Sequence, residues 1–309
     1  MLTSEHGMAL YWGAEFATLY NLGSSPIVGA KHPWALGRPY KDVFPEVWAH
    51  PVSSHFHYVT DTRKSMLIPD EPLIMERHGF LEQCYFDSSF QPVLLDDGTS
   101  GGVLQIITET TGRVLGERRL RLLSETGART AGLLTPDEVA RVVAEVLGSY
   151  PEEIPFLSLY LASEPGMLHP AASTGLQQAP EPVSLNTAAG SEVAARLTEV
   201  VTDGAPATLP AAALAGANTV GQHAAASRLP VEEALALPLD CAGQVGGVLV
   251  VGINPCFPPA GPTGTSGSAR RRRGRGAHRR TRPRRAAPAG GGAGRAGPGQ
   301  DHLLRQRQS

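Results

Sequence analysis

The chain has 309 residues, which is room for about two domains, and 41% of them are hydrophobic, which is enough for buried cores. Its net charge of −2 hides an asymmetry: residues 1–256 carry 14 Lys and Arg against 28 Asp and Glu, whereas residues 257–309 carry 13 Arg against one Asp. No stretch approaches the roughly 20 apolar residues of a membrane helix, and the amino terminus lacks a signal-peptide pattern. These features exclude a membrane-spanning protein and predict a soluble one in which the two regions behave differently.

Three cysteines, Cys84, Cys241 and Cys256, are present in an odd number and without metal-type spacing. This usage predicts a reduced, cytoplasmic setting. Cys84 falls in a predicted strand, where it is interpreted as a small buried hydrophobic residue. Cys241 falls in a predicted turn without a neighbouring His, which argues against attachment of a bilin.

The first 60 residues predict a strand followed by short helical segments. Met8–Gly13 is an apolar strand, and Phe16, Leu19 and Tyr20 recur at helical spacing up to Asn21. Further on we expect a loop with short helical turns over 26–39 and an amphipathic turn over 42–48. The aromatic residues of this region are expected in the core: Trp12, Phe16, Trp34 and Trp48.

A three-strand meander is predicted next, running directly into a polar helix. Its strands are 66–68, 82–93 and 101–108, joined by a hairpin at Glu76–Gly79 and by the turn Asp96–Gly98, because Gly and Asp tolerate the positive φ of tight turns. Charged residues alternate with leucines over 111–126, which indicates a helix. A sheet that hands its last strand to a charged helix suits signalling more than catalysis.

Residues 8–121 resemble a PAS sensor domain of the kind found at the front of bacterial histidine kinases. The resemblance rests on motifs spread along this segment: Trp12–Gly13, Leu19–Asn21, Gly29–Pro33, Ala35–Pro39, Phe44–Trp48 and Val103–Leu120. It implies a five-stranded antiparallel sheet with helices on one face. Residues 49–75 match poorly and are expected to hold a reshaped ligand loop.

No catalytic or metal-binding constellation stands out in the sequence. His50, His55, His57 and His78 lack the spacing of a closed metal site, so no metal is expected. His32, beside a proline, is interpreted as a turn or surface residue in preference to a ligand-pocket residue. PAS pockets hold varied ligands, which leaves haem or flavin open and the cofactor-binding residues unknown.

The second half predicts a helix opening at Thr135-Pro136, with a Thr cap, Pro at the first helical position and acids in the first turn. A strand over 155–162, a turn at 164–166, a helix over 191–200 and a closing hairpin over 234–252 follow. Their order, and Leu237–Gly252 in particular, resembles a GAF domain. Residues 204–230 are rich in alanine and leave any pocket undefined.

The arginine-rich tail lacks apolar periodicity, and we expect it to be disordered. One interpretation is a basic arm for nucleic acid. The preferred one is translation out of frame from near residues 254–259. Permitted codons for Gly299–Ser309, read one base later, give AKTTFFANVSHE, which resembles the phosphoacceptor helix of a histidine kinase.

The sequence therefore predicts an α+β protein: a PAS-like sensor domain over 1–112, a connector helix over 113–130, a GAF-like domain over 131–256 and a disordered tail over 257–309. Each domain is expected to be an antiparallel sheet flanked by helices. The predicted function is the sensory input module of a two-component histidine kinase, truncated before its catalytic core and without enzymatic activity. The alternative is a sensor-domain regulator with a nucleic-acid-binding tail.

Expected partners are a small-molecule signal in the PAS or GAF pocket, and a second copy or a kinase partner at the connector helix. A plain solvated linker helix is the alternative for the connector. No membrane or nucleic-acid partner is expected, and the location is expected to be cytoplasmic.

Resequencing the DNA from the codon for Gly247 to a few hundred bases past the stop tests the reading frame. We expect a one-base change to restore an amphipathic helix followed by AKTTFFANVSHE and an ATP-binding domain. An unchanged frame without a downstream kinase core would contradict this expectation and make the arginine tail a real feature.

Overall fold

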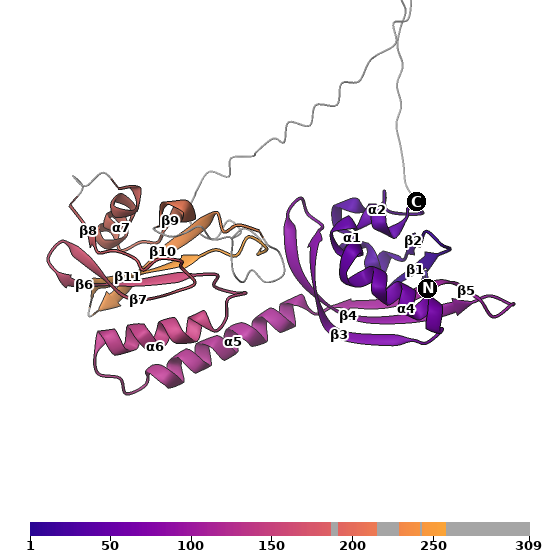
Figure 1. The fold of residues 1–309 in the computed structure, drawn as a ribbon, viewed down its shortest axis with the longest axis horizontal. Helices are drawn as coiled ribbons and strands as arrows, with labels where there is room; N and C mark the ends of the chain where they lie inside the picture. Colours follow the sequence, from indigo (N-terminus) through magenta and orange to yellow (C-terminus); the bar gives the residue numbers. More distant parts are fainter. Residues whose placement is uncertain (187–190, 215–228, 242, 258–309) are drawn as a thin grey trace, which may run out of the picture. The chain divides into compact units, whose positions relative to one another are not determined.

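The first domain contains a five-stranded antiparallel sheet in the order β2-β1-β5-β4-β3 (Figure 1). The computed structural model describes residues 1–186, 191–214, 229–241 and 243–257. The strands are β1 (Gly7–Trp12), β2 (Ala17–Tyr20), β3 (Met66–Glu76), β4 (Leu81–Leu94) and β5 (Ser100–Glu109). The predicted meander is thus confirmed, with β3 longer than expected.

The helical turn predicted at Phe16–Tyr20 is wrong, because this segment is strand β2, paired antiparallel with β1. Gly13 has a φ of 72° and Phe16 a φ of 51°, which close a tight turn between the strands. Thr18 and Tyr20 face the interior and Leu19 faces outward. The apolar spacing that suggested a helix thus belongs to a short strand with one exposed leucine.

Short helices connect β2 to β3 and cover one face of the first sheet (Figure 1). The predicted loop with helical turns and the amphipathic turn are confirmed. The ligand loop expected over 49–75 is instead a short π-helix, a regular α-helix and most of strand β3. The helices are η1 (Leu22–Ser24), α1 (Ser25–Val28), η2 (Gly29–Lys31), α2 (Tyr40–Val43), α3 (Pro45–Val47), η3 (Trp48–Val52) and α4 (Ser53–Thr62).

Strand β3 contains a β-bulge between Ile68 and Glu71. Ile68 pairs with Ser88 and Glu71 with Phe86, so β3 spends one more residue than β4 over this interval. Asp70 lies in this bulged interval and has a φ of 47°. Because side chains alternate along a strand, the bulge turns Glu71 toward the core in place of Asp70.

The core of this domain lies between the sheet and the helices. Phe56 of α4 is fully buried and its ring lies 4.6 Å from Tyr11, 5.0 Å from Phe16 and 5.9 Å from Phe90. Cys84, on β4, is buried as expected. The expectation that all four aromatics are core is wrong for two of them: Trp12 and Trp34 are 43% and 49% exposed.

Trp12 is the last residue of strand β1, and Trp34 stacks its ring on the Arg38 guanidinium, 4.4 Å away. A tryptophan can thus cover about half of its surface through contacts outside the core, such as stacking on an arginine. Phe16 is buried and Trp48 packs partly buried against the core, as predicted.

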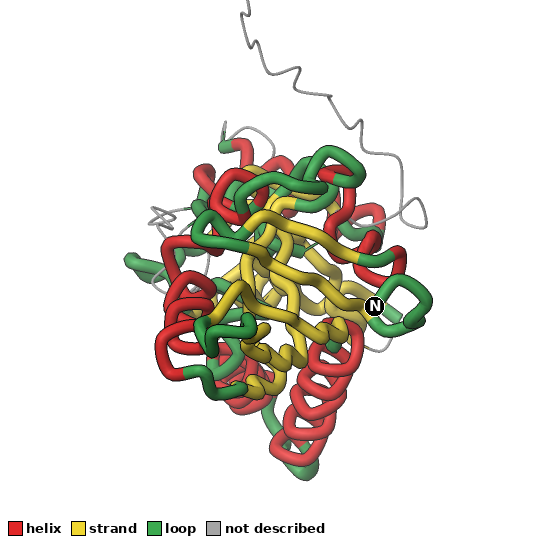
Figure 2. Tube along the Cα trace, turned by 90° about the vertical axis from the view of Figure 1, so that its right-hand side faces the viewer, coloured by secondary structure: helices red, strands yellow, loops and turns green. Residues whose placement is uncertain are grey.

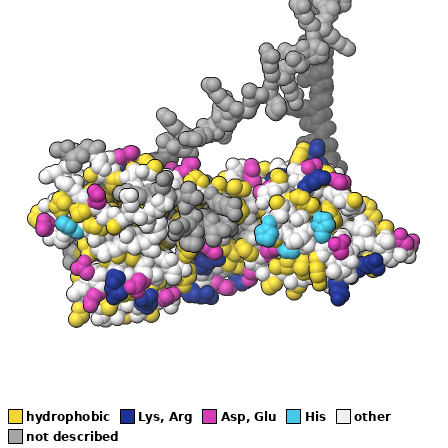
Figure 3. Space-filling view, viewed as in Figure 1, with side chains coloured by type: hydrophobic (Ala, Val, Ile, Leu, Met, Phe, Trp, Pro, Cys, Tyr) yellow, Lys and Arg dark blue, Asp and Glu magenta, His cyan; other side chains and the backbone are white. Residues whose placement is uncertain are grey.

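Helix α5 (Thr111–Thr130) follows β5 after the single residue Thr110, and helix α6 (Pro136–Gly148) turns back alongside it. The Thr135 cap is confirmed as a full capping box with Glu138. In Figure 3 acidic and basic side chains intermingle over the two helices. Arg129, for example, pairs with Glu145 across the hairpin at 2.7 Å.

The second domain contains a six-stranded antiparallel sheet in the order β8-β7-β6-β11-β10-β9. The predicted strand, helix and closing hairpin are confirmed, and β7, β8 and β9 are additions to them. The elements are β6 (Leu157–Glu164), β7 (Met167–Thr174), β8 (Val183–Ser184), α7 (Glu192–Asp203), β9 (Ala207–Pro210), η5 (Ala211–Ala213), β10 (Glu233–Cys241) and β11 (Gln244–Gly252). Helices (red) lie beside the strands (yellow) in Figure 2.

Strand β11 separates two cores in this domain because its side chains alternate between the two faces of the sheet. Val248 and Val250 pack with α7 residues such as Leu197, whereas Leu249 and Val251 pack in the cluster of Leu147 of α6. Helices α6 and α7 therefore cover opposite faces of the second sheet (Figure 1).

The chain is thus an α+β protein with two antiparallel sheets flanked by helices, as predicted. In the described residues, none of the helices combines the length and the apolar character that a membrane crossing needs. The predictions about the tail concern residues 257–309, and from residue 258 onward they lie outside the described part of the chain.

Substituting Phe56→Ala should remove about 3–5 kcal/mol from the free energy of unfolding, because it empties a fully buried aromatic site. Tyr58→Ala is the matched control on the same helix, since Tyr58 is 45% exposed, and it should change stability by no more than about 0.5 kcal/mol. Urea unfolding of both variants measures the difference. Equal losses would show that α4 does not pack as described.

Candidate functional site

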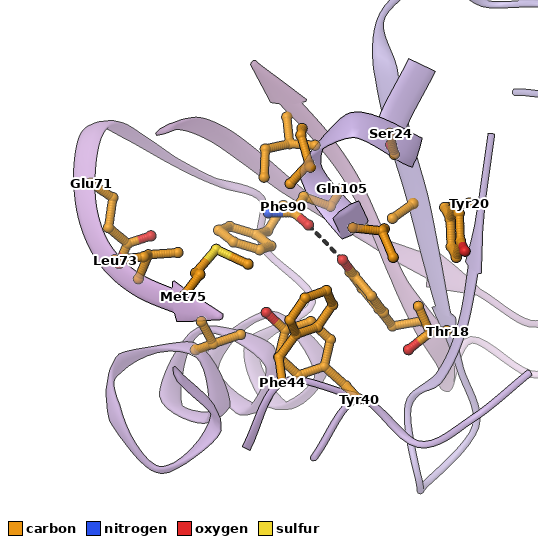
Figure 4. Close-up of a pocket in the computed structure, with 16 residues that line it drawn as sticks. Thr18, Tyr20, Ser24, Tyr40, Phe44, Glu71, Leu73, Met75, Phe90 and Gln105 are labelled. Atoms are coloured by element: carbon orange, nitrogen blue, oxygen red, sulfur yellow. Dashed lines mark hydrogen bonds between the residues drawn. The ribbon is translucent and has the colours of Figure 1, made fainter. Parts of the chain in front are cut away.

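The candidate site is a cavity between the first sheet and its helices (Figure 4). The space open to the centre of a water molecule is about 40 Å³, which is room for a few waters or a ligand of a few heavy atoms. Most of the wall is apolar or aromatic. Aromatic rings come from Tyr11 on β1, Tyr40 on α2, Phe44 after α2 and Phe90 on β4.

A buried hydrogen-bond chain runs along the sheet side of the cavity. The Tyr11 hydroxyl donates to the Gln105 Oε1 at 2.8 Å, and the Gln105 amide donates to the Ser88 hydroxyl at 3.1 Å. The three residues sit on the neighbouring strands β1, β5 and β4. These polar groups satisfy one another, so the chain fixes the wall of the cavity without requiring a ligand.

Glu71 is the acidic residue in the wall of this cavity, and its side chain is 8% exposed. Its Oε1 lies 3.5 Å from the Nε2 of His55 on α4, whereas its Oε2 is buried without a hydrogen-bond partner. Thr18 also brings an unpartnered hydroxyl to the cavity wall. Buried polar atoms without a hydrogen-bond partner in the protein are costly, which marks these groups as candidates for binding.

Burial shifts the protonation of both members of the Glu71–His55 pair. Loss of hydration raises the pKa of Glu71 to about 7. Burial and the nearby His50 lower the pKa of His55. Near neutral pH, His55 is therefore mostly uncharged and Glu71 is poised between its two protonation states.

The residue next to Glu71 connects the sheet to the helix α5. Asp70 Oδ1 accepts a hydrogen bond from the Thr110 hydroxyl at 2.7 Å and pairs with Arg113 at 2.5 Å. These contacts lower the pKa of Asp70, chiefly through the hydrogen bond from Arg113. The bulge of β3 thus directs one carboxylate into the cavity and the adjacent one to the root of α5.

The start of α5 has further ties to β4. The Thr110 amide donates to the Tyr85 carbonyl at 2.8 Å, and the Tyr85 amide donates to the Thr111 hydroxyl at 3.0 Å. Arg77 at the end of β3 donates to Glu109 at 2.7 Å. Burial alone would raise the pKa of Glu109, yet the hydrogen bonds from Arg77 and Thr111 hold it below its usual value.

The four histidines weighed as metal ligands are not brought together. His50, His57 and His78 are exposed, and only His55 reaches the cavity region, through Glu71. Among the residues that the structure describes, no three His, Cys, Asp or Glu side chains form a metal-type group. His32 is exposed, as interpreted, and its Nδ1 lies 2.9 Å from the hydroxyl of the cavity residue Tyr20.

Sequence reasoning missed Glu71, although a signal was present. Glu71, Leu73 and Met75 alternate along one face of β3, which puts an acid in register with buried residues. The prolines at 69 and 72 obscured this strand, because proline is uncommon inside sheets.

A second cavity lies between the second sheet and α7, and its volume is about 330 Å³ on the same measure. Tyr160 of β6, Val193 of α7 and Glu181 line it. This cavity is wider than the first.

No protein-family model matches the chain, and no curated protein matches it. Among solved structures, a GAF domain of A. aeolicus nlh2 is 20% identical with a TM-score of 0.34, covering 44% of this chain and 80% of that one. A PAS domain from Colwellia psychrerythraea is 13% identical with a TM-score of 0.30, covering 36% and 91%. The Vibrio cholerae VqmA dimer is 17% identical with a TM-score of 0.28, covering 35% of this chain and 47% of that one.

All three TM-scores lie below 0.5, and these similarities support no inference about function. What this protein does is therefore inferred from its own cavity and helices.

Stability should fall as the pH rises from about 5 to 7, through the contribution of Glu71. The folded protein holds the Glu71 proton up to a pKa of about 7, whereas the unfolded chain releases it near the ordinary value of about 4.3. Folding therefore binds a proton in this window, and raising the pH weakens it. His55 acts in the opposite direction: because its pKa is lowered in the folded protein, its contribution to the stability of the protein decreases as the pH falls.

The difference between wild type and Glu71→Gln isolates the carboxyl contribution in urea unfolding between pH 5 and pH 8. The variant should lose the downward slope. Glu76→Gln, an exposed acid on the same strand, should keep it. A Glu71→Gln profile parallel to wild type would show that Glu71 titrates normally.

Proposed function

We propose that this chain is a signal-receiving module in which the cavity of the first domain binds a small molecule and helix α5 carries the resulting change onward. One observation supports this most strongly: of two neighbouring residues at the β3 bulge, one lines the cavity and the other contacts the start of α5. Glu71 faces the cavity and Asp70 holds the root of α5. A ligand that moves Glu71 must shift the backbone that also positions Asp70.

Helix α5 has contacts suited to passing such a change to the second domain. Its Leu122 packs with Leu147 of α6 in the core on one face of the second sheet. Arg118 pairs with Glu152, after α6, at 2.6 Å, and it also donates a hydrogen bond to the Tyr85 hydroxyl of β4 at 2.7 Å. Helix α5 therefore contacts strand β4 of the first sheet near its start, and it contacts helix α6 and Glu152, which follows α6, further along.

The coupling through Asp70 and Arg113 is modest in size. Both side chains are partly exposed, at 38% and 48%, so solvent screens their ion pair and it contributes little by itself. The backbone ties at Thr110 and Thr111 make the connection stiffer than the ion pair alone.

We also propose that the module serves a two-component histidine kinase in the cytoplasm and has no catalytic activity itself. The support is the resemblance of residues 8–121 to PAS domains and of Leu237–Gly252 to GAF domains, together with the out-of-frame match to a phosphoacceptor helix. The partner surface we propose is α5, where Leu120 and Leu123 are 69% and 65% exposed. A second copy or a kinase partner would cover them.

Asp70→Ala should separate ligand binding from the response of α5. The test follows backbone amide resonances of the full chain during titration with four small probes: acetamide, acetamidinium, acetate and phenol. We expect at least one probe to shift Leu73 and Met75 at the cavity and also the first turn of α5. In the variant the cavity shifts should persist and the α5 shifts should shrink, because the link to Thr110 and Arg113 is lost.

Glu117→Ala is the matched control. It removes an ion pair to Arg113 within α5 and leaves the Asp70 contacts in place, so the α5 shifts should remain. No cavity shift with any of the four probes would count against the cavity as a binding site. Unchanged α5 shifts in Asp70→Ala would count against the bulge as the connection.

A further inference from the structure

The cavity of the first domain places a carboxylate among aromatic rings. Glu71 Oε2 is buried without a partner, and Tyr11, Tyr40, Phe44 and Phe90 contribute rings to the same wall. Tyr40 lies 5.1 Å from Tyr11 and 5.1 Å from Phe44 between ring centroids, so the rings form a contiguous group. In Figure 4 the Glu71 side chain points from β3 toward this group.

We propose that this cavity selects a small organic cation bearing N–H groups, of the ammonium or amidinium class. The inference rests on the proposed function and adds the chemical class of the ligand. A cation with N–H donors would satisfy the free Glu71 oxygen by a charge-assisted hydrogen bond. The aromatic faces would attract its charge, as they do in sites that recognise organic ammonium ions.

Other ligand classes fit this wall less well. An anion would be repelled by the Glu71 carboxylate and would leave it unpaired. A metal ion needs more ligands than Glu71 and His55 supply, and no third His, Cys, Asp or Glu joins them within the described ranges. A neutral, purely apolar molecule would leave both the Glu71 oxygen and the Thr18 hydroxyl unsatisfied.

The size of the cavity limits the cation to a few heavy atoms. The space for the centres of water molecules is about 40 Å³, which suits a compact ammonium or amidinium group better than a long polyamine. Acetamidinium is a suitable probe because acetamide has nearly the same shape and no charge. Comparing their affinities separates the contribution of charge from the contribution of shape.

Binding of a cation should be coupled to the loss of a proton from Glu71. Without a cation, Glu71 holds that proton up to a pKa of about 7, and binding of the cation requires the ionised carboxylate. The other titratable groups facing Glu71 are His55 from α4, with a lowered pKa, and Tyr40 from α2, with a raised pKa. Both are mostly neutral near pH 7, so neither supplies the countercharge.

The experiment is calorimetric titration of the full chain with acetamidinium and with acetamide at pH 8. We expect acetamidinium to bind at least about tenfold more tightly than acetamide. Its affinity should be about tenfold weaker at pH 6 than at pH 8, because the protonated Glu71 must first ionise. Glu71→Gln should abolish the preference for the cation, and Glu76→Gln, which removes an exposed acid from the same strand, should retain it.

Glu71→Gln should fold, since an amide replaces a buried acid of similar shape, and thermal unfolding of the variant checks this directly. Equal binding of acetamide and acetamidinium, or retained preference in Glu71→Gln, would overturn the cation inference. Binding of acetate or phenol at the cavity without acetamidinium would overturn it too, while leaving the proposed function intact. Failure of all four probes would overturn both.

Discussion

The attachment of α5 to the first sheet is the constraint on which the arrangement depends. Strand β5 passes into the helix through Thr110 alone, and the Thr110 amide donates to the Tyr85 carbonyl on the neighbouring strand. This bond fixes the direction in which the helix leaves the sheet. With a longer or unbonded connection, neither the Asp70 contact nor the pairing of α5 with α6 would report on the state of the sheet.

The bulge of β3 then gives the sheet its chemical asymmetry. One extra residue moves Asp70 away from the interior and brings Glu71 into it. A carboxylate in an aromatic cavity costs free energy when it is ionised and unpaired, which is why burial raises the pKa of Glu71. Two successive residues of one strand thus line the candidate binding cavity and hold the start of α5.

The sequence was informative where local chemistry decides the structure. The turn glycine Gly98 and the Thr135-Pro136 helix start were predicted because φ preferences and capping act within a few residues. Helix α4 was missed because histidines and other polar residues weaken its apolar pattern. The helical spacing at Phe16–Tyr20 was misleading because tertiary pairing with β1 outweighed it.

The candidate site was less predictable than the fold. Glu71 becomes a cavity residue only because of a bulge in β3, and pairing with β4 sets the register of that bulge. The order of residues within β3 does not by itself predict this pairing. The partner of Glu71, His55, was considered only as a metal-ligand candidate, and the histidine spacing argued against that role. Their proximity depends on how α4 packs on the sheet, and 15 intervening positions in sequence do not specify that distance.

The pairing of α5 with α6 has a consequence for behaviour in different salt conditions. Leu122 packs in an apolar cluster with residues of α6, whereas the ion pair across the hairpin is exposed: Arg129 and Glu145 are 43% and 45% exposed. At physiological ionic strength the screening length is already about 8 Å, and at 1 M it is about 3 Å. Concentrated salt should therefore weaken the Arg129–Glu145 ion pair, whereas the apolar contacts of Leu122 and the buried cores of both sheets should persist.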